Sequence, residues 1–61
     1  STIEMVVQVN GKIKEKITVS SDADDATIKN AALEKALAYT EGKTIVKVIV
    51  VKGRLVNIVI K

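Results

Sequence analysis

Residues 42–60, GKTIVKVIVVKGRLVNIVI, decide the fold of this 61-residue chain. The stretch contains two runs of β-branched and aliphatic residues, 44–51 and 55–60, with Lys52 and Gly53 between them. Such residues favour the pleated surface of a sheet, and a glycine between two such runs is typical of a turn. We therefore expect this stretch to form a β-hairpin that supplies much of the core.

The distribution of side chains in this hairpin depends on the length of its turn. A two-residue turn would mix polar and apolar side chains on both faces, whereas a three-residue turn gathers the aliphatic residues on one face. We expect the three-residue turn and a core face of Val46, Val48, Val50, Val56, Ile58 and Ile60. The outer face would carry Ile45, Lys47, Ile49, Val51, Leu55, Asn57, Val59 and Lys61, joined by Val6, Gln8, Lys14 and Lys16.

Another hairpin is predicted around Asn10 and Gly11, because Asn-Gly is a strong hairpin signal. Residues 3–9 alternate with the period of a strand buried on one face. A simple two-residue loop would place Val9 opposite Lys12 and bring lysine onto the apolar face. We therefore expect a three-residue loop or an adjacent bulge. The resulting pairs would be Val9 with Ile13 and Met5 with Ile17.

The segment between the hairpins is predicted to be helical. Asp24 is a suitable N-cap, and Asp25 would lie favourably in the first turn. The apolar residues fall on two helical faces, one with Ile28, Ala31 and Ala32 and the other with Leu33, Ala36, Leu37 and Thr40. We therefore expect two short helices that separate between residues 30 and 34 and end at Gly42.

These elements predict an α+β two-layer sandwich. The order is hairpin, helices, hairpin (ββααββ), with a four-stranded, mainly antiparallel sheet and the helices on one face. The charged second strand is expected at an edge, and the third strand, whose only interior charge is Lys47, in the centre, which gives the order 2-1-3-4. We interpret residues 1–61 as a single domain and, because the chain begins at Ser1, as a piece of a longer protein.

Charge is distributed unevenly along the chain. Residues 1–20 have a net charge of +1, residues 21–42 of −3 and residues 43–61 of +5. The strands and their turns would therefore attract a polyanion such as RNA. With no aromatic residue on the outer face, such binding would use phosphate and sugar contacts. The candidate RNA-binding residues are Lys12, Lys14, Lys16, Lys47, Lys52, Arg54 and Asn57.

Solvent-facing roles remain open for some of these residues. Lys14 and Lys16 would also suit an edge strand that is simply kept soluble. Asn57 would also suit an exposed position without a ligand. A different function, protein docking or dimerisation, would use the aliphatic residues of the outer face, because exposed aliphatic patches often mark such contacts.

The residue types that most catalytic and metal sites need are missing. The chain has no Cys and no His, which removes the thiolate and imidazole groups. The acidic residues 22–25 lack the glycine and the spaced glutamate of a calcium loop. No apolar run approaches the roughly 18 residues of a membrane span. We expect a cytoplasmic domain without catalytic residues, cofactor, metal or membrane contact.

Three segments together resemble a known family. They are residues 7–12 (VQVNGK) with 16–19 (KITV), residues 41–50 (EGKTIVKVIV) and residues 53–59 (GRLVNIV). In combination they resemble the C-terminal domain of bacterial leucyl-tRNA synthetase (leucine–tRNA ligase), over nearly the whole chain. Ser20 and Lys52 stand where the family usually has proline.

The resemblance implies a non-catalytic domain that binds tRNA-Leu. Domains of this family are joined by a flexible tether to a large synthetase and contact the outer corner of tRNA, where the D and T loops meet. Aminoacylation with leucine, and the binding of ATP and leucine, belong to other domains of the parent enzyme. Lys12 and Arg54 are the basic turn residues that match the family pattern. We expect such a domain to be monomeric.

Overall fold

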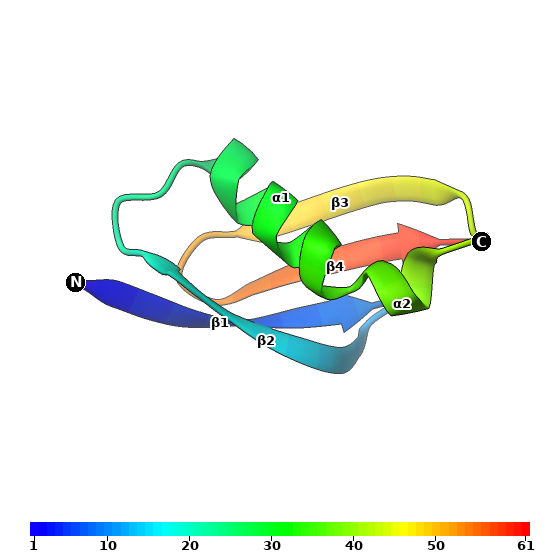
Figure 1. Cartoon of the computed structure of the whole chain (residues 1–61), viewed down its shortest axis with the longest axis horizontal. Helices are drawn as coiled ribbons and strands as arrows, with labels where there is room; N and C mark the ends of the chain where they lie inside the picture. The colour runs from blue at the N-terminus through cyan, green and yellow to red at the C-terminus, as the bar shows by residue number, and fades with distance from the viewer.

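The computed structural model describes all 61 residues as a four-stranded sheet with both helices on one face (Figure 1). The first hairpin consists of β1 (Thr2–Val9) and β2 (Lys12–Ser20). Helices α1 (Asp25–Lys35) and α2 (Leu37–Thr40) follow, and β3 (Ile45–Val51) and β4 (Leu55–Ile60) form the second hairpin. The predicted α+β class and ββααββ order are confirmed.

The order of strands in the sheet is β2-β1-β4-β3, so the prediction that the third strand is central is wrong. Strand β4 is central and pairs in parallel with β1, over Val6–Val9 and Leu55–Ile58, while both hairpins are antiparallel. Strand β3 contains Lys47 and a bulge, two features that natural edge strands use. Strand β4 has no charged residue, which suits the centre. Strand β2 lies at the other edge, as predicted.

The second hairpin has the predicted three-residue turn, Lys52–Arg54. At the end of the hairpin away from this turn, the pairing of β3 with β4 skips Val46, which lies in a bulge and is 52% exposed. The prediction that Val46 belongs to the core face is therefore wrong. Beyond the bulge the alternation is reversed, so Ile45 pairs with Ile60 instead of lying among the outer-face residues.

The first hairpin combines a two-residue turn with an adjacent bulge, so the second of the two predicted arrangements is confirmed. Val9 pairs with Lys12 across the turn, so the expected pairing of Val9 with Ile13 is wrong. The bulge leaves Lys14 unpaired and restores the predicted register for the rest of the strand. As a result Ile13 lies on the outer face of the sheet, with 61% of its surface exposed.

The hydrophobic core lies between the inner face of the sheet and α1. Its buried members are Met5, Val7, Val9, Ile17, Val19, Ala23, Ile28, Ala32, Ala36, Val56 and Ile58. Of the predicted core face of the second hairpin, Val48, Val50 and Ile60 are partly buried against this cluster. The two central strands, β1 and β4, thus contribute the largest share of the buried strand residues.

The helical segment divides at Ala36, later than predicted. The buried residues Ile28, Ala32, Ala36 and Thr40 recur every fourth position, which is one stripe of a helix surface. Because this stripe continues to Ala36, the chain stays helical through residues 30–34. Leu37, assigned to the same apolar face as Thr40, is 57% exposed.

The register of β2 can be tested by truncating two isoleucines of the same strand. Ile17→Ala removes a buried side chain and should lower the free energy of unfolding by about 2–5 kcal/mol. Ile13→Ala removes an exposed one and should change it by no more than about 0.5 kcal/mol. Urea unfolding measures both. Equal losses would contradict the bulge at Lys14.

The N-cap of α1 gives a pH-dependent prediction. Asp24 accepts a hydrogen bond from the backbone N–H of Thr27 at 2.8 Å, which lowers the pKa of Asp24 below its usual 3.8. A lowered folded-state pKa stabilises the protein above the unfolded-state pKa, and the contribution disappears as the pH falls through the folded-state value. Asp24→Asn should therefore lower the melting temperature more at about pH 7 than at about pH 2. An equal difference at both pH values would contradict this role of the carboxylate.

Candidate nucleic-acid interface

The first hairpin turn is held by the neighbouring central strand. Asn10 (φ 52°) and Gly11 (φ 84°) both have positive φ, as a type I′ turn requires. The backbone N–H of Asn10 donates to the carbonyl oxygen of Ile58 at 2.9 Å. The Oδ1 of Asn10 accepts from the backbone N–H of Ile60, also at 2.9 Å. The turn that precedes Lys12 is therefore attached to β4.

Asn57 contributes to the same attachment. Its Oδ1 accepts a hydrogen bond from the backbone N–H of Gly11 at 3.0 Å, and the residue itself pairs with Gln8 across the central strands. The predicted contact of Asn57 with RNA stays a prediction, but its carbonyl oxygen is already engaged within the chain. The sequence contains no local signal for this bond, because the two residues are 46 positions apart.

Lys14 lies toward the helical layer, so its predicted place on the outer face is wrong. The Nζ of Lys14 is 5.7 Å from the centre of the Tyr39 ring, within reach of a cation–π interaction. The hydroxyl of Tyr39 donates to Oε2 of Glu15 at 3.2 Å. This hydrogen bond, with the negative charge of Glu15, raises the pKa of Tyr39. The bulge thus directs Lys14 to α2.

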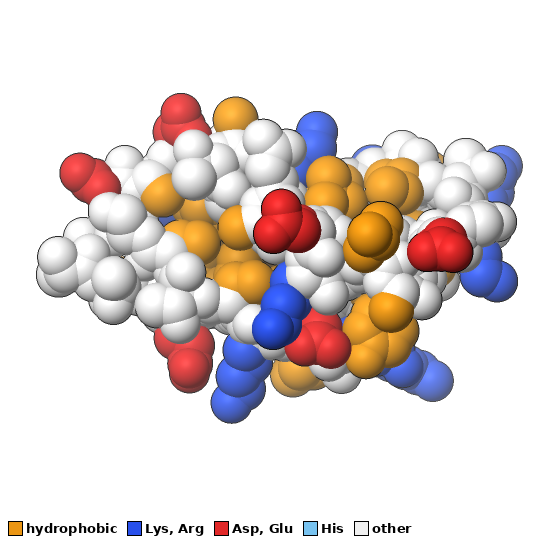
Figure 2. Space-filling view, in the orientation of Figure 1, with side chains coloured by type: hydrophobic (Ala, Val, Ile, Leu, Met, Phe, Trp, Pro, Cys, Tyr) orange, Lys and Arg blue, Asp and Glu red, His pale blue; other side chains and the backbone are white.

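Two lysines outside the predicted set lie at the same end of the sheet as the first turn. Thr44 and Lys61 exchange two backbone hydrogen bonds, of 3.1 and 3.0 Å, which place the end of the chain beside the start of β3 and therefore beside Lys43. Basic side chains project at this end in Figure 2, with an acidic side chain nearby. Lys43 precedes β3 and Lys61 follows β4. Because these two strands form the hairpin predicted from the sequence, their pairing was a signal that the two lysines lie close together.

The second turn lies toward the opposite end of the molecule. Because β4 runs parallel to β1, its six residues separate the two turns by about 20 Å. The pKa of Asp22 is lowered, mainly by the hydrogen bond from Ser20, and the pKa of Asp24 mainly by that from Thr27; the positive charge of Lys52 contributes to both. Lys52 and Arg54 therefore share their end of the molecule with carboxylates.

The remaining predicted residues, Lys16 and Lys47, lie far apart on the outer face. Lys16 pairs with Val6 on one side of the sheet and Lys47 with Val59 on the other. Two central strands separate their own strands, β2 and β3. The structure therefore divides the seven predicted residues between two ends and two edges.

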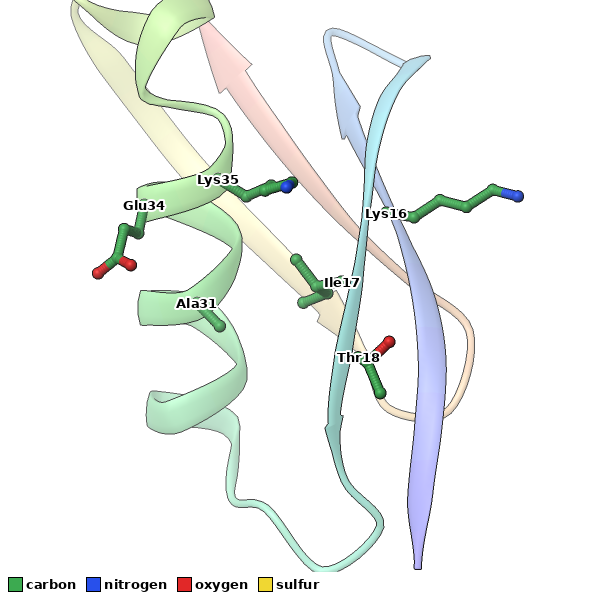
Figure 3. A pocket seen from close by; sticks show the side chains of 6 residues that line it. All are labelled: Lys16, Ile17, Thr18, Ala31, Glu34 and Lys35. Atoms are coloured by element: carbon green, nitrogen blue, oxygen red, sulfur yellow. The ribbon is translucent and has the colours of Figure 1, made fainter.

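The surface also has a shallow hollow of about 480 Å³ between α1 and β2. Figure 3 shows Lys35 reaching from α1 toward the sheet, while the side chains of Lys16 and Thr18 point away from the helix. The hollow contains only Lys16 of the predicted residues. No group of three or more acidic, His or Cys residues is placed to hold a metal ion. No helix has the length and apolar character needed to cross a membrane.

Comparison with known proteins identifies close relatives of the chain. It is 69% identical over 61 residues to leucine–tRNA ligase of Clostridium perfringens strain SM101 and 61% identical over 59 residues to that of Fervidobacterium nodosum, covering 97% of the chain in each case. The chain spans only about 8% of the length of the curated relatives it matches. No family model matches.

A solved structure has the same fold. The chain superimposes with a TM-score of 0.92 on part of the agnB2 LeuRS of Agrobacterium radiobacter K84, whose structure is a ternary complex with tRNA and LeuAMS. The match covers 98% of this chain and 8% of that one, at 21% sequence identity.

These relatives are all aminoacyl-tRNA ligases, and the chain is homologous to one domain of that class of protein. Within this class the chain belongs to the leucyl-tRNA synthetase family, and its predicted resemblance to the C-terminal domain of that family is confirmed.

The hydrogen bond from Gly11 to Asn57 can be tested directly. Asn57→Ala should speed amide hydrogen exchange at Gly11 and lower the free energy of unfolding by about 0.5–1.5 kcal/mol, because the N–H loses its acceptor. Gln8→Ala, on the adjacent strand and the same face, is the control and should leave the exchange of Gly11 unchanged. Unchanged exchange in Asn57→Ala would show that the bond does not hold the turn.

Proposed function

We propose that this domain binds tRNA-Leu as the C-terminal appendage of a leucyl-tRNA synthetase, at the outer corner of the tRNA. The observation that carries the proposal is the basic end of the sheet, formed by Lys12, Lys43 and Lys61 around the first turn. The relatives support it, since they are ligases of tRNA and the structural neighbour was solved with tRNA.

The domain would contact the phosphates of the RNA backbone. Lysine ammonium groups attract phosphates irrespective of sequence, and such contacts position a protein without reading bases. The single aromatic residue, Tyr39, contacts Glu15 and Lys14 on the helical side, so no aromatic side chain is available on the outer face to stack on a base. We therefore propose recognition by charge and shape.

The first turn is suited to this task because it is already fixed. Asn10 and Gly11 are attached to β4 by three hydrogen bonds, two of them through asparagine side chains. A turn that is ordered before binding loses less conformational entropy when it meets the RNA. Lys12, the next residue, would thus hold its charge next to a turn that is already ordered.

The two basic ends would not contribute equally. Lys52 and Arg54 are about 20 Å from the first turn and share their end with Asp22 and Asp24. The carboxylates oppose the attraction of phosphate there. We propose that Lys12, Lys43 and Lys61 form the main contact, with Lys52 and Arg54 as a second, weaker one.

The parent enzyme would supply the chemistry. We propose that aminoacylation, with the sites for ATP and leucine, resides in the rest of the polypeptide in the cytoplasm. A flexible tether would hold this domain close to the tRNA bound there. Even weak binding by the isolated domain would then be useful, because a tether raises the effective concentration.

Binding of tRNA-Leu by charge-matched variants tests the proposal. We expect the wild-type domain to bind weakly in fluorescence anisotropy, with an affinity that falls steeply as salt is raised. Lys12→Ala/Lys43→Ala should weaken binding most and reduce the slope of log affinity against log salt by about one unit for each phosphate that the variant can no longer neutralise. Lys52→Ala/Arg54→Ala should have a smaller effect.

The control removes the same charge from the helical layer. Lys29→Ala/Lys35→Ala alters two exposed lysines of α1 and should change binding least. Absence of binding at low salt would overturn the proposed function. An equal loss in all three double variants would show attraction to net charge without a defined site.

A further inference from the structure

One row of side chains crosses all four strands on the outer face of the sheet. Gln8 of β1 pairs with Ile13 of β2 and with Asn57 of β4, and Asn57 pairs in turn with Ile49 of β3. Side chains of paired residues lie on the same face of a sheet, and neighbouring strands are about 4.8 Å apart, so the row extends over roughly 14 Å. Two amides therefore lie next to each other in the middle of the sheet, with an isoleucine at either end of the row.

The isoleucines of this row are accessible. Ile13 is 61% and Ile49 40% exposed, whereas the two amide residues between them are half-buried. Exposed aliphatic carbon gains free energy when any apolar surface covers it, including the C–H groups of a sugar. The row therefore combines a polar centre with two apolar contact points.

The amide groups at the centre have free hydrogen-bonding capacity. The Oδ1 of Asn57 accepts from Gly11, so its Nδ2 lies on the other side of the amide as a donor. No hydrogen bond within the chain engages that Nδ2 or the amide of Gln8. The chain has no buried polar side-chain atom without a partner, so these amide atoms are open to solvent. The bond from Gly11 thus fixes which way the donors of Asn57 face.

The amide pair lies beside the basic end of the sheet. Gly11, whose N–H bonds to Asn57, directly precedes Lys12. On the same outer face, Lys47 pairs with Val59, which is two residues further along β4 toward that end. An RNA strand whose phosphates contact these lysines would therefore bring its riboses to the amide pair.

We propose that Gln8 and Asn57 form a site for the ribose 2′-hydroxyl groups of the bound RNA. The inference deepens the proposed function and rests on it for the presence of RNA. A 2′-hydroxyl both donates and accepts hydrogen bonds, and it is the group that distinguishes RNA from DNA. The carbonyl oxygen of Gln8 would accept from such a hydroxyl, and the Nδ2 of Asn57 would donate to one. Ile13 and Ile49 would pack against the adjoining sugars.

The chemistry of the row favours a sugar over the other parts of a nucleotide. A phosphate is held by positive charge, and the row itself has none. An unstacked base is typically held on an aromatic ring or a guanidinium plane, and the row contains neither. A ribose needs neutral hydrogen-bonding groups and aliphatic contact, and the row supplies both. The domain would thus select RNA over DNA of the same charge.

Removing 2′-hydroxyls from the ligand tests the proposal. The probes are tRNA-Leu and a chimera of the same sequence with 2′-deoxy nucleotides throughout the D and T loops. In fluorescence anisotropy at low salt, the unaltered domain should bind the chimera about 3- to 10-fold more weakly, the effect of about one hydrogen bond. Equal affinity for both probes would overturn the ribose site and leave the proposed function intact. Binding of neither probe would overturn the proposed function, and the ribose site with it.

A variant of Gln8 separates a sugar contact from a phosphate contact. Gln8→Met keeps the length of the side chain and removes its hydrogen-bonding groups. It should weaken binding of tRNA-Leu about 2- to 5-fold and leave binding of the chimera unchanged. The slope of log affinity against log salt should stay the same, because no phosphate contact is lost. An equal loss on both probes, or a changed slope, would contradict the ribose site.

The matched control removes an amide from the helical layer. Asn30→Ala alters an exposed residue of α1 and should leave the affinity for both probes unchanged. Asn57 is kept in every variant, because its Oδ1 also holds the first turn. Equal effects of Asn30→Ala and Gln8→Met would show that the loss does not come from the outer face and would contradict the proposal.

Discussion

The parallel pairing of β1 with β4 is the interaction on which the rest of this structure depends. It joins two hairpins that would otherwise be separate, over Val6–Val9 and Leu55–Ile58, and both strands contribute fully buried residues to the core. Isolated hairpins are marginal in water, whereas four strands under a helix can bury a continuous core. The asparagine side chains at positions 10 and 57 extend this pairing beyond the strands to the first turn.

The same pairing gives the molecule two ends with different sets of charged residues. Parallel central strands place the two hairpin turns toward opposite ends of a body 34 Å long. One end then gathers lysines from the first turn, the start of β3 and the last residue, with an acidic side chain nearby, and the other combines Lys52 and Arg54 with Asp22 and Asp24. The pairing also leaves β3 as an edge. The proposed RNA contact therefore follows from the topology of the sheet.

Much of this architecture follows from local patterns, and the errors have a common physical origin. Asn10 and Gly11, the N-cap Asp24 and the three-residue turn at Gly53 were predictable because turn and cap chemistry is local. A bulge beside the first turn was one of the two predicted arrangements, because lysine would otherwise lie on the apolar face. The bulge at Val46 was not predicted, because one extra residue reverses the side-chain alternation without any signature in composition. Strand order and the bond from Gly11 to Asn57 depend on contacts distant in sequence. Lys43 and Lys61 were overlooked although the predicted hairpin of residues 42–60 already brings its two ends together.

The central claim, that the basic end around the first turn contacts tRNA, is tested most directly by residue-resolved NMR. In a titration of the ¹⁵N-labelled domain with tRNA-Leu at low salt, we expect the amide signals of residues 10–12, 43–44 and 61 to shift or broaden first. Signals of α1 should change last, because its layer carries the negative charge of the chain. Perturbations confined to α1, or to the outer face with the first turn unaffected, would contradict this claim.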